Sequence, residues 1–428
     1  MSHPVTMFAV VSVLCCAISV ILAIPFDVVP EHEYELDQDI GFTYEMLAAL
    51  PAAKMYTPAE RIQNAGYVAE THNVVTQDGY ILGVHRISGS KKYPPSVKKP
   101  AVLLMHGLLD CSATWVIPSP EQSLGFLLAD WGFDVWMGNA RGNRYSRGHT
   151  KWTTSDKEFW SFSWHEIGVY DIPAIIDHIL EKTELQKIFY IGHSQGGTSF
   201  FVMASERPEY QKKLIASFNL APAVFMKRMF SPFMRLLIPF ADDLKKLAEI
   251  IGMYEFKPTS DTIRKLVEVI CQNDAATQPL CSNIIFLMGG FRDKDLNVSL
   301  IPSIVQYDPA GASTLQFLHY AQIIKTGNFQ KLDYGRADNL KKYGSAQPPQ
   351  YNLANINMPV YLHYGSNDWM VNTKDLEELH STLSNSQKFL VPYKQFTHLD
   401  FLWGMHAKSL LYDNIISLMF RHKKEFEA

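Results

Sequence analysis

The 428-residue sequence lacks the signatures of several classes of protein. It contains no H-E-x-x-H motif, no cysteine pair at zinc-binding spacing, no G-x-G-x-x-G after an apolar run and no phosphate-binding P-loop. The formal net charge of −4 offers no basic footprint for nucleic acid. Internal repeats and low-complexity tracts are missing as well. We therefore expect no metal, no cofactor and no nucleic-acid partner.

Charged residues are missing from the N-terminus until Asp27. An almost wholly apolar run, residues 5–24, fills this stretch and has a small residue, Ala23, near its end. These features are typical of a cleaved signal peptide, although the basic n-region is missing, and we place that peptide at residues 1–23. The run is also long enough to span a bilayer, so a retained anchor is the alternative. No later segment is apolar enough to span, so no stable transmembrane span should remain after cleavage.

Cysteine is scarce, with five residues in the chain. Cys15 and Cys16 lie in the expected signal peptide, which leaves Cys111, Cys271 and Cys281. An odd number permits one disulfide and one free thiol, or an intermolecular pair. A short loop could join Cys271 to Cys281, and Cys111 would then be a small buried hydrophobic residue.

The rest of the composition is that of a globular protein. Hydrophobic residues make up 47% and charged residues 19%, which indicates a sizeable core. The length suits one large α/β domain with an insertion, or two domains. Residues 24–56 are rich in acidic side chains, with no Lys or Arg before Lys54, and we interpret them as a solvated leader.

Strand and helix patterns alternate along most of the remaining chain. Residues 67–76 and 80–87 predict a hairpin, and the apolar run 101–105 predicts a strand buried on both faces of a parallel sheet. Further strands are predicted at 133–137, 187–191, 214–220, 358–364 and 388–393, and helices at 123–129, 170–182, 198–205, 376–383 and 410–422. This order predicts an α/β fold with a doubly wound sheet.

The alternation stops at residues 221–222 and resumes after the Gln-Pro-Pro sequence at 347–349. Between them we predict helices rather than strands, at 226–251, 262–271 and 313–325. The first of these is strongly apolar, as expected for the core of a helical subdomain or for a cap over an apolar ligand. We therefore divide the chain into a first core part (57–221), a helical cap and lid (222–349) and a second core part (350–428).

The residues 190–200 contain Gly192-x-Ser194-x-Gly196, the spacing of a nucleophile elbow between a strand and a helix. Asp368 follows the predicted strand 358–364, and His398 follows 388–393. Sites in open α/β sheets form at the carboxyl ends of strands. A serine hydroxyl becomes a nucleophile when an imidazole takes its proton and a carboxylate holds the imidazole. The order therefore predicts a triad of Ser194, Asp368 and His398.

Other candidates and the oxyanion hole complete the predicted site. Structural roles are expected for the remaining histidines near the C-terminus, namely His363, His380, His406 and His422. Asp375 opens a predicted helix, as a cap or as a partner of its dipole, and Asp400 could support His398. An oxyanion hole needs two backbone donors, and the N–H groups of Gln195 and Leu108 occupy the expected places.

Taken together, these segments resemble the acid lipase family, which includes gastric and lysosomal acid lipases and secreted insect lipases. The resemblance covers roughly residues 56–420 and rests on residues 76–82 with 86–87, 106–109, 134–142, 192–196, 308–313, 347–349, 367–368 and 398–401. It implies an α/β-hydrolase core with a mostly helical cap and lid, and the same triad and oxyanion donors. It also implies a disulfide between Cys271 and Cys281. Gly197 departs from the threonine of the mammalian members and leaves the triad intact.

The resemblance and the motifs predict a secreted, cofactor-independent carboxylic ester hydrolase. The most direct reading is a triacylglycerol lipase that meets its lipid ester substrate at a lipid–water interface and works through an acyl-enzyme. Asn297 lies in an N-glycosylation sequon, which suits a secreted protein. A sterol-ester hydrolase would share every motif, and a non-catalytic lipid-binding or storage protein could use the same fold. The lysosomal lumen is the alternative location.

Overall fold

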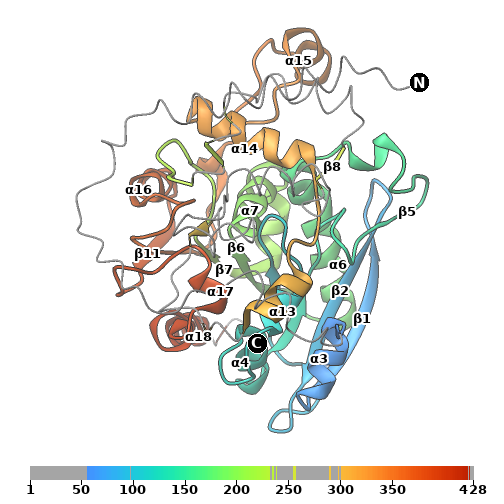
Figure 1. Ribbon diagram of the computed structural model, residues 1–428, viewed down its shortest axis with the longest axis vertical. Helices are drawn as coiled ribbons and strands as arrows, with labels where there is room; N and C mark the ends of the chain where they lie inside the picture. Colours follow the sequence, from blue (N-terminus) through green and yellow to red (C-terminus); the bar gives the residue numbers. More distant parts are fainter. Residues whose placement is uncertain are drawn as a thin grey trace, which may run out of the picture. The chain divides into compact units, whose positions relative to one another are not determined.

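The computed structural model describes residues 55–96, 98–231 and 300–422, together with the short stretches 234–235, 238, 254–256, 289–290, 297 and 424 (Figure 1). All of them belong to one compact unit, residues 43–428. The expected signal peptide, almost all of the acidic leader, the helix at 262–271 and the Cys271–Cys281 pair lie outside the described residues. None of the described helices is long and apolar enough to cross a membrane.

A nine-stranded mixed sheet organises the described residues, in the order β1-β2-β4-β3-β6-β7-β10-β11 with β5 paired to β2. The strands are β1 (Val68–Val75), β2 (Tyr80–Gly89), β3 (Ala101–Met105), β4 (Asp134–Met137), β5 (Gly148–His149), β6 (Ile188–His193), β7 (Leu214–Leu220), β10 (Val360–Tyr364) and β11 (Ser386–Leu390). From β4 to β11 all neighbours are parallel, whereas β1 and β2 form an antiparallel hairpin at one edge (Figure 1). The predicted hairpin and doubly wound parallel sheet are confirmed.

The central strands are apolar because helices cover them. Every residue of β3, β4, β6, β7 and β10 is buried, while β11, at the edge of the sheet, is partly exposed. The helices around the sheet are α3 (Pro58–Asn64), α4 (Leu124–Asp130), α5 (Trp164–Glu166), α6 (Ile172–Thr183), α7 (Gln195–Glu206), α16 (Thr373–Thr382), α17 (Asp400–Trp403) and α18 (Asp413–Arg421). Single turns of π-helix, η3 (Ile167–Asp171) and η8 (Lys408–Tyr412), lead into α6 and α18.

Between β7 and β10 the described residues contain α13 (Ile301–Tyr307), α14 (Thr314–Thr326) and α15 (Arg336–Tyr343). Helix α14 matches the predicted helix at 313–325. The expectation of helices alone is wrong, because β8 (Glu255–Phe256) and β9 (Ala312–Ser313) form a small antiparallel pair. Two-residue strands are too short to leave an alternating pattern in the sequence.

The predicted helix at 226–251 is wrong over residues 226–231, which form a turn and irregular chain. Tertiary hydrogen bonds account for the difference. The backbone N–H groups of Phe230 and Ser231 donate to the carbonyl oxygen of Trp369, at 2.8 and 2.9 Å. The N–H of Arg228 donates to the Asp375 carboxylate at 2.8 Å. These donors are thereby withdrawn from a helical pattern, in which each N–H would bond four residues back.

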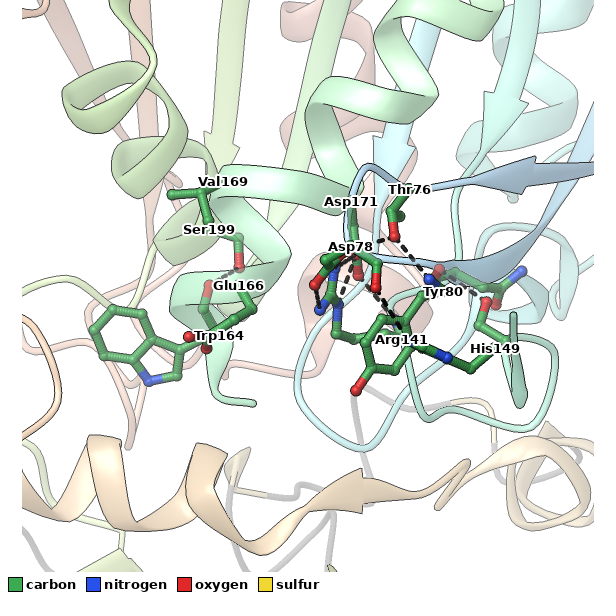
Figure 2. Close-up of polar contacts among 12 residues, drawn as sticks. Thr76, Asp78, Tyr80, Arg141, His149, Trp164, Glu166, Val169, Asp171 and Ser199 are labelled. Carbon is green, nitrogen blue, oxygen red and sulfur yellow. Dashed lines mark hydrogen bonds and ion pairs between the residues drawn. The ribbon is translucent and has the colours of Figure 1, made fainter. Parts of the chain in front are cut away.

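A buried arginine ties three separate segments together next to the sheet (Figure 2). The Arg141 side chain lies between Asp78, in the β1–β2 turn, and Asp171, in η3, at 2.6 Å from each carboxylate. Its guanidinium also lies 4.0 Å from the centre of the Tyr80 ring. A buried charge is stable only when it is paired and hydrogen-bonded, and both carboxylates meet that need. This network anchors the loop after β4, which borders the candidate site.

Candidate active site

Ser194 occupies a sharp turn between β6 and α7. Its backbone has φ 50° and ψ −112°, a conformation that side chains rarely adopt, and its N–H donates to Leu220 O at 2.9 Å. The flanking glycines are required by close backbone contacts. A Cβ on Gly192 would lie 2.6 Å from the carbonyl carbon of Gly196, and a Cβ on Gly196 would lie 2.3 Å from Met105 O. The turn therefore presents the serine side chain at the carboxyl end of the sheet.

Gly197, whose place in the motif the sequence left unexplained, packs against Pro222. A Cβ at this position would come 2.7 Å from Pro222 Cβ and 3.0 Å from its Cα. Because α7 begins so close to the end of β7, there is room only for a hydrogen atom. A threonine here would require the chain at Pro222 to move.

His398 and Asp368 form a buried pair. His398 Nδ1 lies 2.8 Å from Asp368 Oδ2, and Asp368 Oδ1 accepts hydrogen bonds from the N–H groups of Met370 and Val371, at 2.8 and 2.9 Å. With Oδ1 accepting from two backbone N–H groups, the carboxylate presents Oδ2 as the acceptor for His398 Nδ1. It therefore fixes the proton of His398 on Nδ1 and leaves Nε2 as a base.

The loop that carries His398 has its own support. The Asp400 carboxylate accepts from the N–H and the hydroxyl of Thr397, at 2.7 and 2.9 Å. His193, next to Ser194, lies 3.0 Å through its Nε2 from the His398 carbonyl oxygen. Burial lowers the pKa of His193 well below its usual range, so this imidazole is neutral and donates to that carbonyl. The expectation that Asp400 supports His398 agrees with these contacts, whereas the contribution of His193 had no signal beyond its place in the elbow motif.

Ser194 and His398 line one cavity, and the loop 106–110 forms another part of its wall. The residues around it are Gly107, Leu108, Asp110, His193, Ser194, Gly289, Met370, His398, Leu399, Leu402 and Trp403. Apolar side chains dominate this set, so an ester group beside Ser194 would lie in a largely apolar environment. Asp368 contacts His398 but is not one of the residues that line the cavity.

Backbone donors approach Ser194 from two directions. Gln195 is the first residue of α7, and the first N–H groups of a helix have no partner within the helix. On the other side, a Cβ on Gly107 would lie 3.3 Å from Ser194 Cβ, so the chain before Leu108 passes directly against the serine. The side-chain oxygen of Gln195 accepts from Gln316 in α14 at 3.1 Å.

His106 holds the start of this loop, a role that the His-Gly motif alone did not reveal. Its Nδ1 lies 2.8 Å from Gly107 O, and its Nε2 accepts from the N–H of Ala140 at 3.1 Å. Burial lowers the pKa of His106 to about 4, so the ring stays neutral and acts as donor on one side and acceptor on the other. Asn143 adds a contact to the same Nε2 at 3.2 Å.

The other predicted candidates lie away from the cavity among the described residues. His363 contacts Asn414, His380 contacts Ser386, and His422 contacts Tyr361, while His406 is exposed.

The outcome differs for the remaining predicted residues. Asn372 is the N-cap of α16, so the capping role of Asp375 is wrong. Asp375 lies in the first turn of the helix, as the dipole alternative requires, and the buried Asp375 carboxylate binds Arg228. Cys111 is a free, fully buried thiol, as expected, and Asn297 is partly exposed.

Comparison with known proteins finds matches to family models and to related chains. Residues 58–119 match the model of a partial alpha/beta-hydrolase lipase region, and residues 100–235 match that of the alpha/beta hydrolase fold. Lipase 3 of Drosophila melanogaster is 45% identical over 84% of this chain and 92% of its own length. Lipase 1 of the same fly is 40% identical over 84% of this chain and 78% of its own length. The human lysosomal acid lipase/cholesteryl ester hydrolase is 39% identical over 85% of this chain and 91% of its own length.

The sheet and these matches define an α/β hydrolase. More narrowly, the chain belongs to the acid lipase family, and it is a carboxylic ester hydrolase. The lipid-carrier alternative is thereby set aside.

Proposed function

We propose that the protein is a secreted lipase that hydrolyses triacylglycerol through Ser194, His398 and Asp368. The Ser194 oxygen attacks the ester carbonyl carbon while its proton passes to His398 Nε2. The bond to the alcohol then breaks, and His398 returns the proton to the departing oxygen. Water next attacks the acyl-enzyme and gives one proton to His398. Fatty acid leaves as Ser194 regains that proton.

The observation that carries the proposal is the 2.8 Å hydrogen bond between His398 and Asp368, together with the cavity that His398 and Ser194 both line. The carboxylate keeps the imidazole in the tautomer that accepts a proton at Nε2, and it stabilises the imidazolium formed during attack. His398 and Ser194 line the same cavity, and the backbone of Ser194 is in a strained turn, as expected for a base and its nucleophile.

The N–H groups of Leu108 and Gln195 are the proposed oxyanion donors. Their positions on either side of Ser194 suit an oxygen that becomes negative as the carbonyl is attacked. Fixed donors of this kind stabilise the transition state because they need no reorganisation when the charge develops. The first turn of α7 adds the positive end of its helix dipole.

The choice of alcohol separates two candidate substrates. The apolar cavity residues Met370, Leu399, Leu402 and Trp403 suit an acyl chain and favour lipid esters over polar ones. The human relative is named a cholesteryl ester hydrolase as well as a lipase, which supports a sterol ester as the second candidate. Hydrolysis rates on emulsified triacylglycerol, cholesteryl ester and short soluble esters, measured at acid and neutral pH, would rank them.

Secretion is proposed from the expected signal peptide and the Asn297 sequon. Expression of the full chain in animal cells, followed by N-terminal sequencing of the protein in the medium, tests cleavage near Ala23. A glycosidase-sensitive mass that disappears in Asn297→Gln would establish the glycan. Retention of the mature protein in lysosomes would favour the alternative location.

Covalent labelling tests the nucleophile directly. A fluorophosphonate probe should modify the wild-type protein and Ser381→Ala, in which an exposed serine is removed. Ser194→Ala should neither react nor hydrolyse esters, while its unfolding transition stays within a few degrees of the wild type. Labelling or ester hydrolysis that survives in Ser194→Ala would remove Ser194 from the mechanism.

A further inference from the structure

Two carboxyl groups from distant parts of the chain meet beside the active-site cavity. Asp110 ends the loop 106–110 and lines the cavity, while Asp308 follows α13. They are 5% and 1% exposed. A carboxyl oxygen from each lies within 4.8 Å of the other and of the Cys111 sulfur. Two buried acids this close cannot both carry a full negative charge without a large cost in free energy.

The hydrogen bonds around the pair indicate where a proton resides. Asp110 Oδ1 accepts from the N–H of Cys111 at 2.6 Å, so Asp110 already acts as an acceptor. Within the described part of the chain, neither oxygen of Asp308 has a hydrogen-bond donor. A buried carboxylate without donors is strongly unfavourable, whereas a protonated Asp308 can donate its O–H to Asp110. Burial raises the pKa of both carboxyls, and the charge of Asp110 raises that of Asp308 further.

Among the described residues, Arg144 is the cation near the pair. The groups that face it are Cys111, Arg144, Tyr145 and Tyr307, with His193 and His398 across the cavity. Burial raises the pKa of the Cys111 thiol and of both tyrosines, so these three stay neutral. The positive charge of Arg144 lowers the pKa of Asp308, but burial and the charge of Asp110 raise that pKa by more. The Arg144 guanidinium donates a hydrogen bond to Gln306 O at 2.6 Å.

A backbone bond joins the same two segments. The N–H of Ala310 donates to the carbonyl oxygen of Leu109, in the middle of the loop. Leu109 has φ 66°, a left-handed conformation that is unfavourable for leucine and persists only where its neighbours hold it. The contacts of Leu109 and Asp110 therefore tie the loop to residues 308–310. This tie begins at the residue that follows Leu108.

We propose that Asp110 and Asp308 are positioning residues, and that the proton they share fastens the loop 106–110 to residues 308–310 and so holds the Leu108 N–H beside Ser194. The inference rests on the proposed function, in which Leu108 is an oxyanion donor. With the proton bound, Asp308 donates to Asp110. When the proton is lost, two buried carboxylates repel each other, and the loop moves away from the serine. The tie is present at low pH and is lost as the pH rises through the raised pKa of the pair.

Two substitutions at Asp308 separate the proton from the side chain. Asp308→Asn keeps a donor toward Asp110 at every pH. Its kcat on a soluble short-chain ester should stay within about threefold of the wild type at low pH, and the fall of kcat at high pH should move upward or vanish. Asp308→Ala has no donor. Its kcat should be at or below about one tenth of the wild-type value at all pH values, with KM little changed, because a misplaced oxyanion donor raises the barrier. Asp338→Asn, on an exposed helix, is the matched control and should follow the wild type.

Infrared difference spectra provide a readout that needs no activity. A pH titration of the wild type should show a protonated-carboxyl band that disappears with rising pH, and Asp308→Asn should lack it. If Asp308→Asn does not fold, Asp110→Asn serves in its place, because its amide can donate to Asp308 and still accept from Cys111 N–H. A stoichiometric divalent cation, bound to the wild type and lost in Asp308→Asn, would overturn the shared proton.

Failure of this proposal is distinguishable from failure of the proposed function. If the fluorophosphonate labels Ser194 but Asp308→Asn keeps the wild-type pH profile, the carboxyl pair does not position the loop and the mechanism stands. If Ser194 is not labelled, the mechanism itself fails.

Discussion

Gly107 lies directly against Ser194: a Cβ built on the glycine would come 3.3 Å from Ser194 Cβ and 3.2 Å from His193 Nδ1. This contact brings the loop 106–110 to Ser194, the proposed nucleophile. A side chain at position 107 would require the loop, Ser194 or His193 to shift by a few tenths of an ångström. The absence of a Cβ at this position therefore permits the close approach of the loop to Ser194.

Gly107→Ala should lower kcat on a soluble ester about tenfold or more, with a smaller change in KM, because the displaced donor serves the transition state. The fold should persist. Gly344→Ala offers the opposite pattern. Its position has open space but φ 69°, so it should cost about 1 kcal/mol of stability and leave kcat unchanged. Equal activity of wild type and Gly107→Ala would show that the loop adjusts without consequence.

Asp368→Asn should reduce kcat by about 10⁴-fold while the protein remains folded, because an amide no longer holds the proton of His398 on Nδ1. The hydrogen bonds from Met370 and Val371 would turn the amide oxygen toward them and its NH₂ toward the imidazole. Steady-state kinetics and a thermal scan measure both quantities. Asp413→Asn, at an exposed ion pair, is the control. A loss below tenfold would mean that another acid orients His398.

Removal of Arg141 should destabilise the fold by about 3–5 kcal/mol, because Asp171 would be left buried without its cation. Even with Arg141 present, burial raises the pKa of Asp171 to about 6. Arg141→Met can be compared with Arg141→Met/Asp171→Asn in urea unfolding. The double variant should recover part of the loss, since it removes the unpaired charge. Arg336→Met changes an exposed arginine and should be neutral; a similarly small effect at Arg141 would contradict the proposed anchoring role.

The pH dependence of stability follows from the buried pair of Asp110 and Asp308. Burial raises the folded-state pKa of both acids above the value in the unfolded chain, so the folded state binds protons more tightly. Their contribution to stability is therefore complete at low pH and declines as the pH rises through the raised pKa. Unfolding temperatures of the wild type should fall over that range. Asp308→Asn should flatten the decline, and a parallel decline in this variant would assign it to other groups.

Several elements could be predicted because their cause is local. The apolar runs at 101–105 and 214–220 became β3 and β7 with the expected bounds, since a strand buried on both faces needs apolar residues throughout. The hairpin around Gly79 and the helix α14 also followed from local patterns. Residues 226–231 could not be predicted in the same way, because Trp369 and Asp375, far along the chain, accept their backbone hydrogen bonds.

By itself the sequence determined the kind of chemistry: a serine between glycines, then an aspartate and a histidine, each after a strand. It could do so because the order of strands in a parallel sheet brings their carboxyl ends to one edge. Only the tertiary structure decided what supports that chemistry. The neutral His106 and His193, the Arg141 anchor and the Asp110–Asp308 pair depend on burial and on contacts between distant segments. Burial sets the charge of a side chain, and no spacing along the chain reveals which acids will meet in the interior.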